Sequence, residues 1–538
     1  MPYTTASQQQ KDAVATMIGK MMKPTNPPTN NSFTLGWDVV ASYSDKQINK
    51  LLSTRHQKKG SGMLSSLGLK VEDWDPIGEE TFTTTYDLRF GAPLLQFDSH
   101  ATGEPMCSIQ MEIISGTKQI RDKDPKPIPA GWKLQLHNIP LATARGKVSE
   151  GGQIEGGVEN IVPGDKPVHF QGANEDYCHV VLGFHLNKDK LKVEAISPDP
   201  LNPKDKSLGF MKTSFQEGFL DFFTGNNGKT ALSYSIASVN NVESPGYIDL
   251  KPVKFQFATF SKGDLGIISI FIHVNGGFAD GTTEGLQSLW QAQWLQNNTQ
   301  PIPEHFTASL ILSSEMIHRV LLQPGFRKSN WEAKNNTKST DICNKVEARS
   351  REIWRISKQQ HNYGNSEFHV DGADINLHNF PMYMTISQNN AAGSPEVSAY
   401  WKITQSFNWK AVHPILSDDT GTVNANFRLC DPNNFDQPRH METHITLDDE
   451  TFGIDLQLNT SNFRMDQKEE NGINYETWRK GMEGLWTSAP NVKISSIGLG
   501  FLRTTNILTP DARVIDFNEE IGLKAPKDFV LVGDVLDY

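Results

Sequence analysis

The sequence has few cysteines and no excess of basic residues. Only four of its 538 residues are cysteine, at positions 107, 178, 343 and 430, and no two of them form a C-x-x-C pair. This spacing supports neither a disulfide framework nor a zinc ribbon. Lys and Arg total 51 against 62 Asp and Glu, so the net charge is −11 and no nucleic-acid partner is expected.

Long apolar runs are also missing. No stretch reaches the roughly 18 uncharged apolar residues that a transmembrane helix needs. The first 22 residues lack the basic start, the continuous apolar core and the small-residue cleavage site of a signal peptide. We therefore expect a soluble chain without a transmembrane segment, which is cytoplasmic or released by a non-classical route.

The common catalytic motifs are absent from the sequence. It contains no H-E-x-x-H and no G-x-S-x-G string, and the nearest approach to a P-loop, at residues 228–230, has Phe223 in place of the first glycine. Acidic pairs such as Glu79-Glu80 lie in polar stretches, where a solvated loop is the default explanation. We predict a protein that is not an enzyme and has no cofactor.

One polar row could in principle bind a metal. His440, Glu442 and His444 fall at i, i+2 and i+4, so they would share one face of a strand. The same face continues with Thr446, which favours an ordinary solvent-facing row. We therefore predict no metal site.

Apolar and aromatic residues are plentiful. Hydrophobic residues make up 37% of the chain, with 28 Phe and 11 Trp, which is ample for a large buried core. Residues 441–447 and 452–458 alternate between apolar and polar positions on either side of an acidic turn, which predicts an antiparallel hairpin with one buried face. Similar alternation at 107–113 and 423–429 and apolar runs at 177–186 and 267–274 predict further strands.

A few segments have helical spacing. The periodic apolar residues lie within 12–22, 215–223, 286–294 and 475–486. In the second segment, Thr213 and Gln216 resemble a capping box and Gly225 supplies a stop. A proline-rich linker follows the first segment and separates it from the body of the protein. The apolar face of this helix could therefore pack on the body, bind a partner or contact a membrane weakly. Many strands and few helices predict an α+β protein with antiparallel sheets.

The two halves of the chain contain similar segments. Residues 39–52 and 309–322 both run from an apolar stretch through a serine and an acid into a helical pattern, at an offset of 270. Ser44 and Asp45 match Ser314 and Glu315, and each serine would cap its helix. The sequence thus predicts an N-terminal extension (1–31), a first module (32–300) and a second module (301–538). The Gly- and Pro-rich region 117–165 is expected to form a surface excursion.

Three segments carry a resemblance to a known family. They are TLGWDVVASYSDKQINKLL (34–52), the connector PIPEHFTASLILSSE (301–315) and the terminus APKDFVLVGDV (525–535). They resemble the clostridial P-47 family, the small non-toxic TULIP proteins of botulinum OrfX-type gene clusters. The resemblance implies two TULIP-like modules, each a strongly curved antiparallel sheet wrapped around a long helix and enclosing an apolar groove. The N-terminal 31 residues extend beyond the family pattern.

The same resemblance implies a function. The chain would bind lipid or another apolar ligand without catalysing a reaction, as a component of a bacterial toxin or insecticidal system. The residues expected to line the grooves are Ile48, Leu51 and Leu52 in the first module and Ile317, Val320 and Leu321 in the second. An ordinary closed core needs the same apolar residues. The alternatives are therefore an assembly protein with closed cores that binds other proteins of its gene cluster, and a carbohydrate-binding or pore-forming β protein.

Overall fold

The structure is a computed structural model of the full chain. It describes residues 5–23, 32–58, 64–98, 103–146, 161–170 and 515–535. It also describes residues 177–429 except for 187, 200, 203–205, 226–233, 242–250, 279–280, 364 and 389–394, and the backbone of four later strands at 439–447, 452–457, 463–466 and 493–494. The predicted helix at 475–486, the linker at 24–31 and the side chains of His440, Glu442 and His444 lie outside the described residues.

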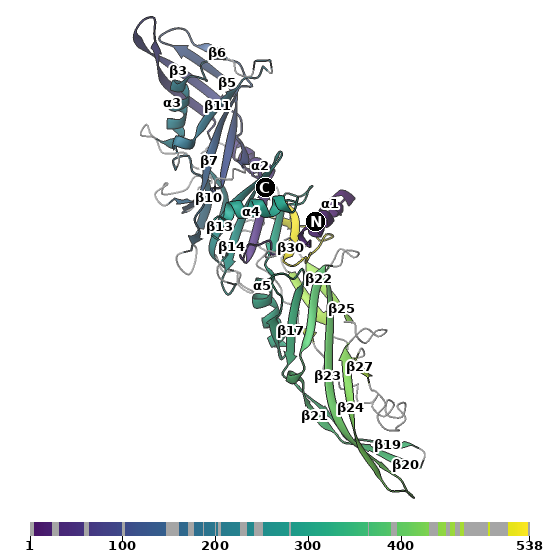
Figure 1. Ribbon diagram of the computed structural model, residues 1–538. Coiled ribbons are helices and arrows are strands. Elements are labelled where there is room, and N and C mark those ends of the chain that lie inside the picture. Colours follow the sequence, from purple (N-terminus) through teal and green to yellow (C-terminus); the bar gives the residue numbers. More distant parts are fainter. Residues whose placement is uncertain are drawn as a thin grey trace.

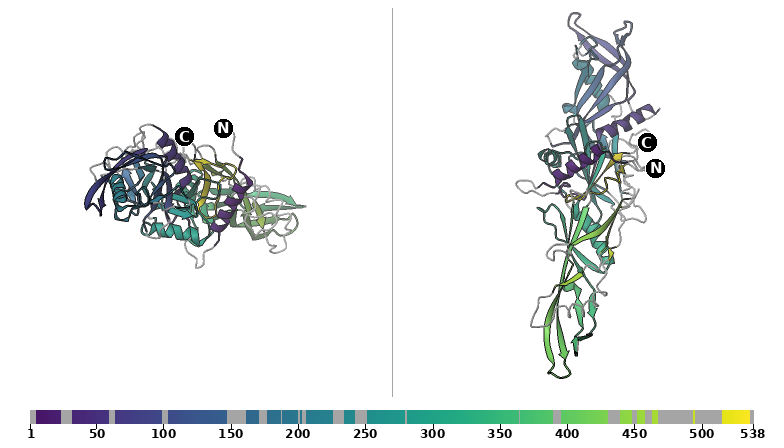
Figure 2. Two further views of the ribbon diagram at one scale, coloured as in Figure 1. Left: turned by 90° about the horizontal axis from the view of Figure 1, so that it is seen from above. Right: turned by 90° about the vertical axis from the view of Figure 1, so that its right-hand side faces the viewer.

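The molecule is elongated and consists of three large antiparallel sheets in a row (Figures 1 and 2). A central sheet lies between an N-terminal wing and a C-terminal wing, which extend in opposite directions. Both chain ends lie near the central sheet. The predicted α+β class with antiparallel sheets and few helices is confirmed.

The central sheet draws its strands from both halves of the chain. Its order is β29-β30-β15-β1-β14-β13-β9. The strands are β1 (Val39–Ser44), β9 (Val168–His169), β13 (Pro252–Lys262), β14 (Leu265–Val274), β15 (Ala308–Leu312), β29 (Ile515–Phe517) and β30 (Phe529–Val535). At its centre β1 pairs antiparallel with β15, so that Val39 faces Leu312 and Tyr43 faces Ala308. Because both halves build this sheet, the division at residues 300 and 301 does not separate two independent sheets, and the domain boundaries stay a prediction.

The two similar sequence segments occupy equivalent places. β1 leads into α2 (Asp45–Gln57), and β15 leads into a continuous helical segment of α5 (Ser314–Met316), the π-helical η2 (Ile317–Leu322) and α6 (Gln323–Lys328). Each half then builds one wing and returns to the central sheet with a hairpin, β13–β14 beside β1 and β29–β30 beside β15. The arrangement is therefore that of an internal repeat about the β1–β15 pair.

The caps of these two helices differ from the prediction. Ser44 stands at the N-cap of α2, but its hydroxyl makes no capping hydrogen bond. In the second helix the cap is Ser313, whose hydroxyl accepts a hydrogen bond from the Met316 amide at 3.0 Å, and not Ser314. The long helix that the family resemblance implies is not seen in the described residues, since α2 has 13 residues.

The N-terminal wing is a ten-stranded sheet covered by α3 (Thr213–Thr224). Its strands are β2 (Ser66–Asp75), β3 (Glu80–Phe90), β4 (Leu94–Asp98), β5 (Met106–Ile120), β6 (Lys126–Ile128), β7 (Lys133–Arg145), β8 (Val162–Pro163), β10 (Tyr177–Leu182), β11 (Lys192–Ile196) and β12 (Ser235–Asn240), with a short 3₁₀ turn η1 (Lys188–Lys190). β5, β6 and β7 occupy most of residues 117–145, so the surface excursion expected there is wrong for that part.

Helix α3 fills the wing with aromatic side chains. Phe215, Phe219 and Phe223 are fully buried and successive rings lie 5.8 and 5.1 Å apart. The helix ends as predicted at Gly225, whose φ of 76° is in the left-handed region that favours glycine. Its N-cap is Lys212 without a side-chain hydrogen bond, so the predicted capping box at Thr213 is wrong.

In the described residues, the C-terminal wing is an eleven-stranded sheet. Its strands are β16 (Trp331–Asn335), β17 (Asn344–Ser350), β19 (Gln359–Tyr363), β20 (Ser366–Val370), β22 (Met382–Gln388), β23 (Pro395–Val412), β24 (Asp419–Leu429), β25 (Arg439–Leu447), β26 (Phe452–Gln457), β27 (Phe463–Asp466) and β28 (Lys493–Ile494). A separate ribbon pairs β18 (Ile353–Ile356) with β21 (Ala373–Asn376), followed by η3 (Leu377–Asn379). The hairpin predicted from residues 441–458 is confirmed as β25 and β26.

Two helices cover the outer face of the central sheet. α1 (Gln8–Met21) and α4 (Leu286–Gln296) belong to an apolar cluster that also contains Val40, Phe271 and Val530 from the sheet. A capping box of Ser7 and Gln10 starts α1. Of the three roles considered for this helix, packing on the body is therefore the one that the structure contains.

Candidate ligand site at the strand-helix junctions

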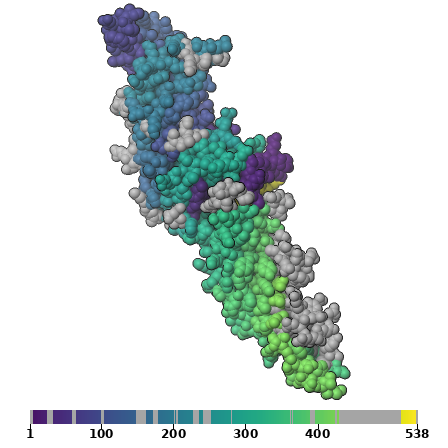
Figure 3. All heavy atoms as spheres, viewed as in Figure 1, coloured from purple at the N-terminus to yellow at the C-terminus, as the bar shows by residue number. Residues whose placement is uncertain are grey.

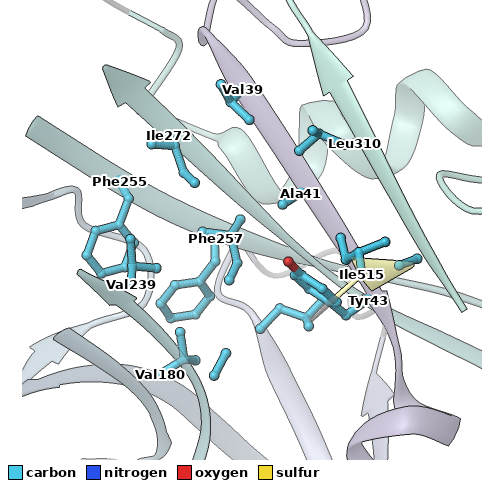
Figure 4. Close-up of a cluster of buried hydrophobic side chains, with 14 of the residues drawn as sticks. Val39, Ala41, Tyr43, Val180, Val239, Phe255, Phe257, Ile272, Leu310 and Ile515 are labelled. Carbon is cyan, nitrogen blue, oxygen red and sulfur yellow. The ribbon is translucent and has the colours of Figure 1, made fainter. Parts of the chain in front are cut away.

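The inner face of the central sheet faces an apolar interior that continues into both wings. Figure 4 shows side chains from β1, β13, β14, β15 and β29 meeting Val180 and Val239, which come from the N-terminal wing. The same contiguous cluster extends from Trp132 in that wing to Trp354 and Phe427 in the other. The alternation of β1 explains the arrangement, because Val39, Ala41 and Tyr43 point to this side. The interior is thus one apolar region shared by the whole molecule.

A buried polar atom lies inside this region. The side chain of Tyr43 is fully buried, and among the described residues its hydroxyl has no hydrogen-bond partner. Figure 4 shows the ring among Ala41, Phe257 and Ile515. Burial raises the pKa of this phenol, so it stays protonated and can donate a hydrogen bond. An unsatisfied buried hydroxyl costs about 1–3 kcal/mol. A ligand atom that accepts from Tyr43 would remove this cost.

The next two residues place further buried polar atoms at the start of α2. Among the residues that the structure describes, the Ser44 hydroxyl and the Asp45 Oδ1 atom have no hydrogen-bond partner. The other carboxylate oxygen, Oδ2, accepts a hydrogen bond from the Gly266 amide of β14 at 3.0 Å. Burial raises the pKa of Asp45 to about 6, against the opposing effect of the Gly266 hydrogen bond. The β1–α2 junction therefore combines an uncharged donor, a hydroxyl and a carboxyl group that titrates near neutrality.

Close backbone contact at this junction depends on glycine. A Cβ atom at Gly266 would lie 2.4 Å from Asp45 Oδ2 and 3.0 Å from the Phe97 amide nitrogen. The other side of α2 is tied to the N-terminal wing by Asn49, whose side-chain amide accepts from the Leu95 amide at 2.6 Å and donates to its carbonyl at 2.8 Å. These contacts hold the helix start firmly against both sheets.

The residues predicted to line a groove lie next to the two junctions. Ile48 and Leu52 on α2 and Ile317 and Leu321 on η2 are buried members of the shared interior. Val320 is half-buried against it, and Leu51 is half-buried on α2. The structure thus brings four of the six into one apolar region, and their contact with a ligand stays a prediction.

A cavity lies at the second junction. Its volume is about 300 Å³, and it is lined by Ser313, Ser314 and Glu315, by Phe278 and by mostly polar residues of the segments 32–36, 335–339 and 527–528. Asp528 closes its base, where the carboxylate accepts from the Phe33 amide at 2.6 Å, the Ser32 hydroxyl at 3.0 Å and the Ser314 amide at 3.1 Å. Burial raises the pKa of Asp528 despite these bonds. Its role is to join three distant segments of the chain.

The π-helical segment η2, which follows this junction, carries the buried imidazole of His318. His318 is buried, and among the described residues its Nε2 atom has no hydrogen-bond partner. Burial lowers the pKa of His318 to about 4, and the polar side chain of Asn344 opposes the shift. The ring is therefore neutral at physiological pH. π-Helical turns often occur at functional sites, and this one places a titratable group inside the molecule.

Sequence reasoning did not find Tyr43, Asp45 or His318. The alternation of residues 39–43 indicates that Tyr43 points inward, but a buried tyrosine usually has a hydrogen-bond partner. Which partner it has depends on strands more than 200 residues away. Among the described residues, no group of three or more His, Cys, Asp or Glu side chains could hold a metal ion. None of the helices in that part of the chain is long and apolar enough to span a membrane.

Comparisons with known proteins give the following picture. No protein-family model matches the chain, and no curated protein matches it. Among solved structures, P47 from Clostridium botulinum A2 is similar at 12% identity and a TM-score of 0.49, over 93% of this chain and 98% of that chain. Lipopolysaccharide binding protein is similar at 8% identity and a TM-score of 0.24, over 94% of this chain and 99% of that chain. The resemblance to the clostridial P-47 family that the sequence predicts is therefore found again among solved structures.

Proposed function

We propose that this protein binds a lipid or another apolar ligand in its interior and does not act as an enzyme. The observation that carries the proposal is the buried Tyr43 hydroxyl, which has no hydrogen-bond partner among the described residues and lies in an apolar region that both wings share. A fatty acid or a lipid ester has the matching chemistry, because an acyl chain is apolar and its carbonyl group accepts one hydrogen bond. Each buried CH₂ group would contribute about 0.8 kcal/mol.

The C-terminal wing is the part of the interior that we propose for the acyl chain. Inward-facing residues of β23 include Ile403 and Phe407, which are buried. Buried apolar side chains of this kind would give an acyl chain apolar contacts.

We place the protein in a bacterial toxin or insecticidal system. This part of the proposal is supported by the three sequence segments that resemble the clostridial P-47 family. Its partners would then include other proteins of the same gene cluster. Pull-down of the gene-cluster proteins with the full chain tests this part separately from lipid binding.

A closed-core assembly protein is the second candidate. It is favoured by the N-terminal wing, where the three buried phenylalanines of α3 occupy the inner side of the sheet. In this case the unsatisfied Tyr43 hydroxyl would simply be a cost that the fold tolerates. The two candidates therefore differ in what replacement of Tyr43 does.

The test uses Tyr43→Phe, with Tyr234→Phe as the matched control. Tyr234 is also buried, but its hydroxyl accepts a hydrogen bond from the Leu64 amide at 3.0 Å. Native mass spectrometry after incubation with oleic acid or phosphatidylcholine measures the bound ligand, and thermal unfolding measures stability. If Tyr43 binds lipid, Y43F lowers lipid occupancy and removes the stabilisation by lipid, whereas Y234F lowers stability alone.

A photoactivatable phosphatidylcholine locates the acyl chain. Labelled peptides from β23 or β24 would support the C-terminal wing, and Ile403→Trp should reduce that labelling because it fills the inner face. Tyr383→Trp, on the exposed face of β22, is the control. A chain that stays lipid-free, together with a Y43F variant that is only more stable, would overturn the proposal and favour the assembly protein.

A further inference from the structure

The two ends of the molecule both carry exposed apolar side chains. At the end of the C-terminal wing, β23 and β24 form a long hairpin whose turn contains Ile415 and Leu416 (Figures 1 and 3). Ile415 is 91% exposed and Leu416 is 73% exposed. We call these two adjacent residues the apolar tip. The turn that joins β23 to β24 lies at one extreme end of the molecule in Figures 1 and 2. Exposed large aliphatic residues are common singly, but an adjacent pair at a protruding tip indicates an interaction surface.

The hairpin presents the apolar tip on a rigid support. The last pair of the ladder joins Ala411 and Asp419, directly below the turn. Lys410 forms an ion pair with Asp418 at 2.7 Å, and His413 lies 3.8 Å from Asp419. β20 pairs with β23 along this stretch and stiffens the stem. The tip is therefore held away from the body.

The opposite end has a similar feature. The β2–β3 turn carries Ile77, which is 94% exposed, and the neighbouring Trp74, which is 61% exposed. Asp75 Oδ1 orders this turn by accepting from the amides of Ile77 and Gly78 at 3.0 and 3.2 Å. Two ordered turns at opposite ends thus expose apolar side chains.

We propose that the apolar tip of the C-terminal wing inserts into the surface of a lipid bilayer. A convex turn with two aliphatic side chains fits between lipid headgroups, where the side chains reach the acyl boundary while the strand ladder stays paired. A protein partner would instead need a matching concave pocket. This inference concerns the outer surface and does not rest on an internal ligand.

The charges beside the tip indicate which membrane it fits. Lys410 is paired with Asp418, and the second acid of the turn, Asp419, lies 3.8 Å from His413. The lysine also holds the pKa of Asp418 below its usual value through their hydrogen bond. The turn therefore has no unpaired lysine or arginine that would attract anionic headgroups. The apolar tip fits a zwitterionic phosphatidylcholine surface, and binding should not increase when anionic lipid is added.

The experiment is flotation of the full-length protein with phosphatidylcholine vesicles. The double variant Ile415→Ser/Leu416→Ser is expected to bind at least tenfold more weakly. The control Leu201→Ser removes a side chain that is equally exposed, at 93%, in the segment between β11 and α3 of the N-terminal wing, and should bind as the parent does. Circular dichroism and thermal unfolding verify that the variants are folded.

A second measurement reports insertion directly. The Leu416→Trp variant should gain fluorescence that brominated phosphatidylcholine quenches, beyond the quenching of the parent protein. Retention of full vesicle binding by I415S/L416S would overturn the proposal, as would an L416W signal that brominated lipid does not change. Loss of binding only in an Ile77→Ser variant would transfer the role to the opposite end and equally refute the assignment to this tip. Vesicle binding without internal lipid would contradict the proposed function and leave this inference standing.

Discussion

Acidification should destabilise the protein through His318. The folded chain keeps this imidazole neutral because burial lowers its pKa to about 4, whereas an exposed histidine in the unfolded chain has a pKa near 6.5. Between these values the unfolded state binds more protons. The stabilising effect of the neutral ring is therefore complete above about pH 6.5 and is lost as the pH falls toward 4. The shift of about 2.5 pKa units corresponds to about 3 kcal/mol.

The assay is urea-induced unfolding of the wild type and His318→Gln at pH 7 and pH 4.5. Glutamine has no charge at either pH and retains a side chain that can hydrogen-bond Asn344. The free energy of unfolding of the wild type should fall between the two pH values by about 2–3 kcal/mol more than that of H318Q. Hydrogen exchange of residues 317–322 should accelerate in the wild type alone. Equal losses in both proteins would refute the role of His318.

Three further predictions concern the junctions and the core. Because the pKa of Asp45 is raised to about 6, its ionisation should destabilise the folded protein as the pH rises through 6. Urea unfolding should show that the free energy of unfolding of Asp45→Asn rises by about 2 kcal/mol relative to that of the wild type between pH 4 and pH 7. The same difference between the two proteins at both pH values would contradict this. Gly266→Ala should lower the free energy of unfolding by about 2 kcal/mol or more, because its Cβ would overlap Asp45. The control Gly19→Ala, in the uncrowded interior of α1, should leave the free energy of unfolding unchanged or raise it by up to about 1 kcal/mol. Equal effects of the two substitutions would argue against the close contact. Phe219→Ala should lower the free energy of unfolding by about 3–5 kcal/mol, because Phe219 is fully buried. Leu289→Ala, at an exposed position, should lower it by about 0.5 kcal/mol or less. A loss as small for Phe219→Ala as for Leu289→Ala would contradict a closely packed interior of the N-terminal wing.

The sequence predicted the positions of strands and helices better than it predicted which residues they contact. Alternating apolar residues identified the β25–β26 hairpin, and the spacing of Phe215, Phe219 and Phe223 identified the buried face of α3. Both patterns are local, since they follow from the repeat of side-chain direction along one strand or helix. The error at Thr213 is of another kind. Capping depends on which residue first leaves the helical conformation, and here this is Lys212.

The candidate site was predictable only in part. Ile48 and Leu52 were expected to face an apolar interior, and they do, because their spacing marks one side of a helix. The missing partner of the Tyr43 hydroxyl could not be predicted, because the atoms around it come from β13, β15 and β29. The same holds for Asp45, whose carboxylate meets an amide 221 residues further along the chain.

The sequence by itself determined the sheet-rich class and the main helices, since each depends on a local pattern. It also determined the internal repeat and the places of the two strand-helix junctions, since these follow from the comparison of two segments. The tertiary structure alone decided that β1 pairs with β15 and that both halves share one sheet. It also decided that polar atoms of Tyr43, Ser44 and Asp45 are buried without a hydrogen-bond partner among the described residues. The physical reason is that pairing and burial depend on chain segments far apart in sequence, whose meeting is selected by the packing of the whole molecule.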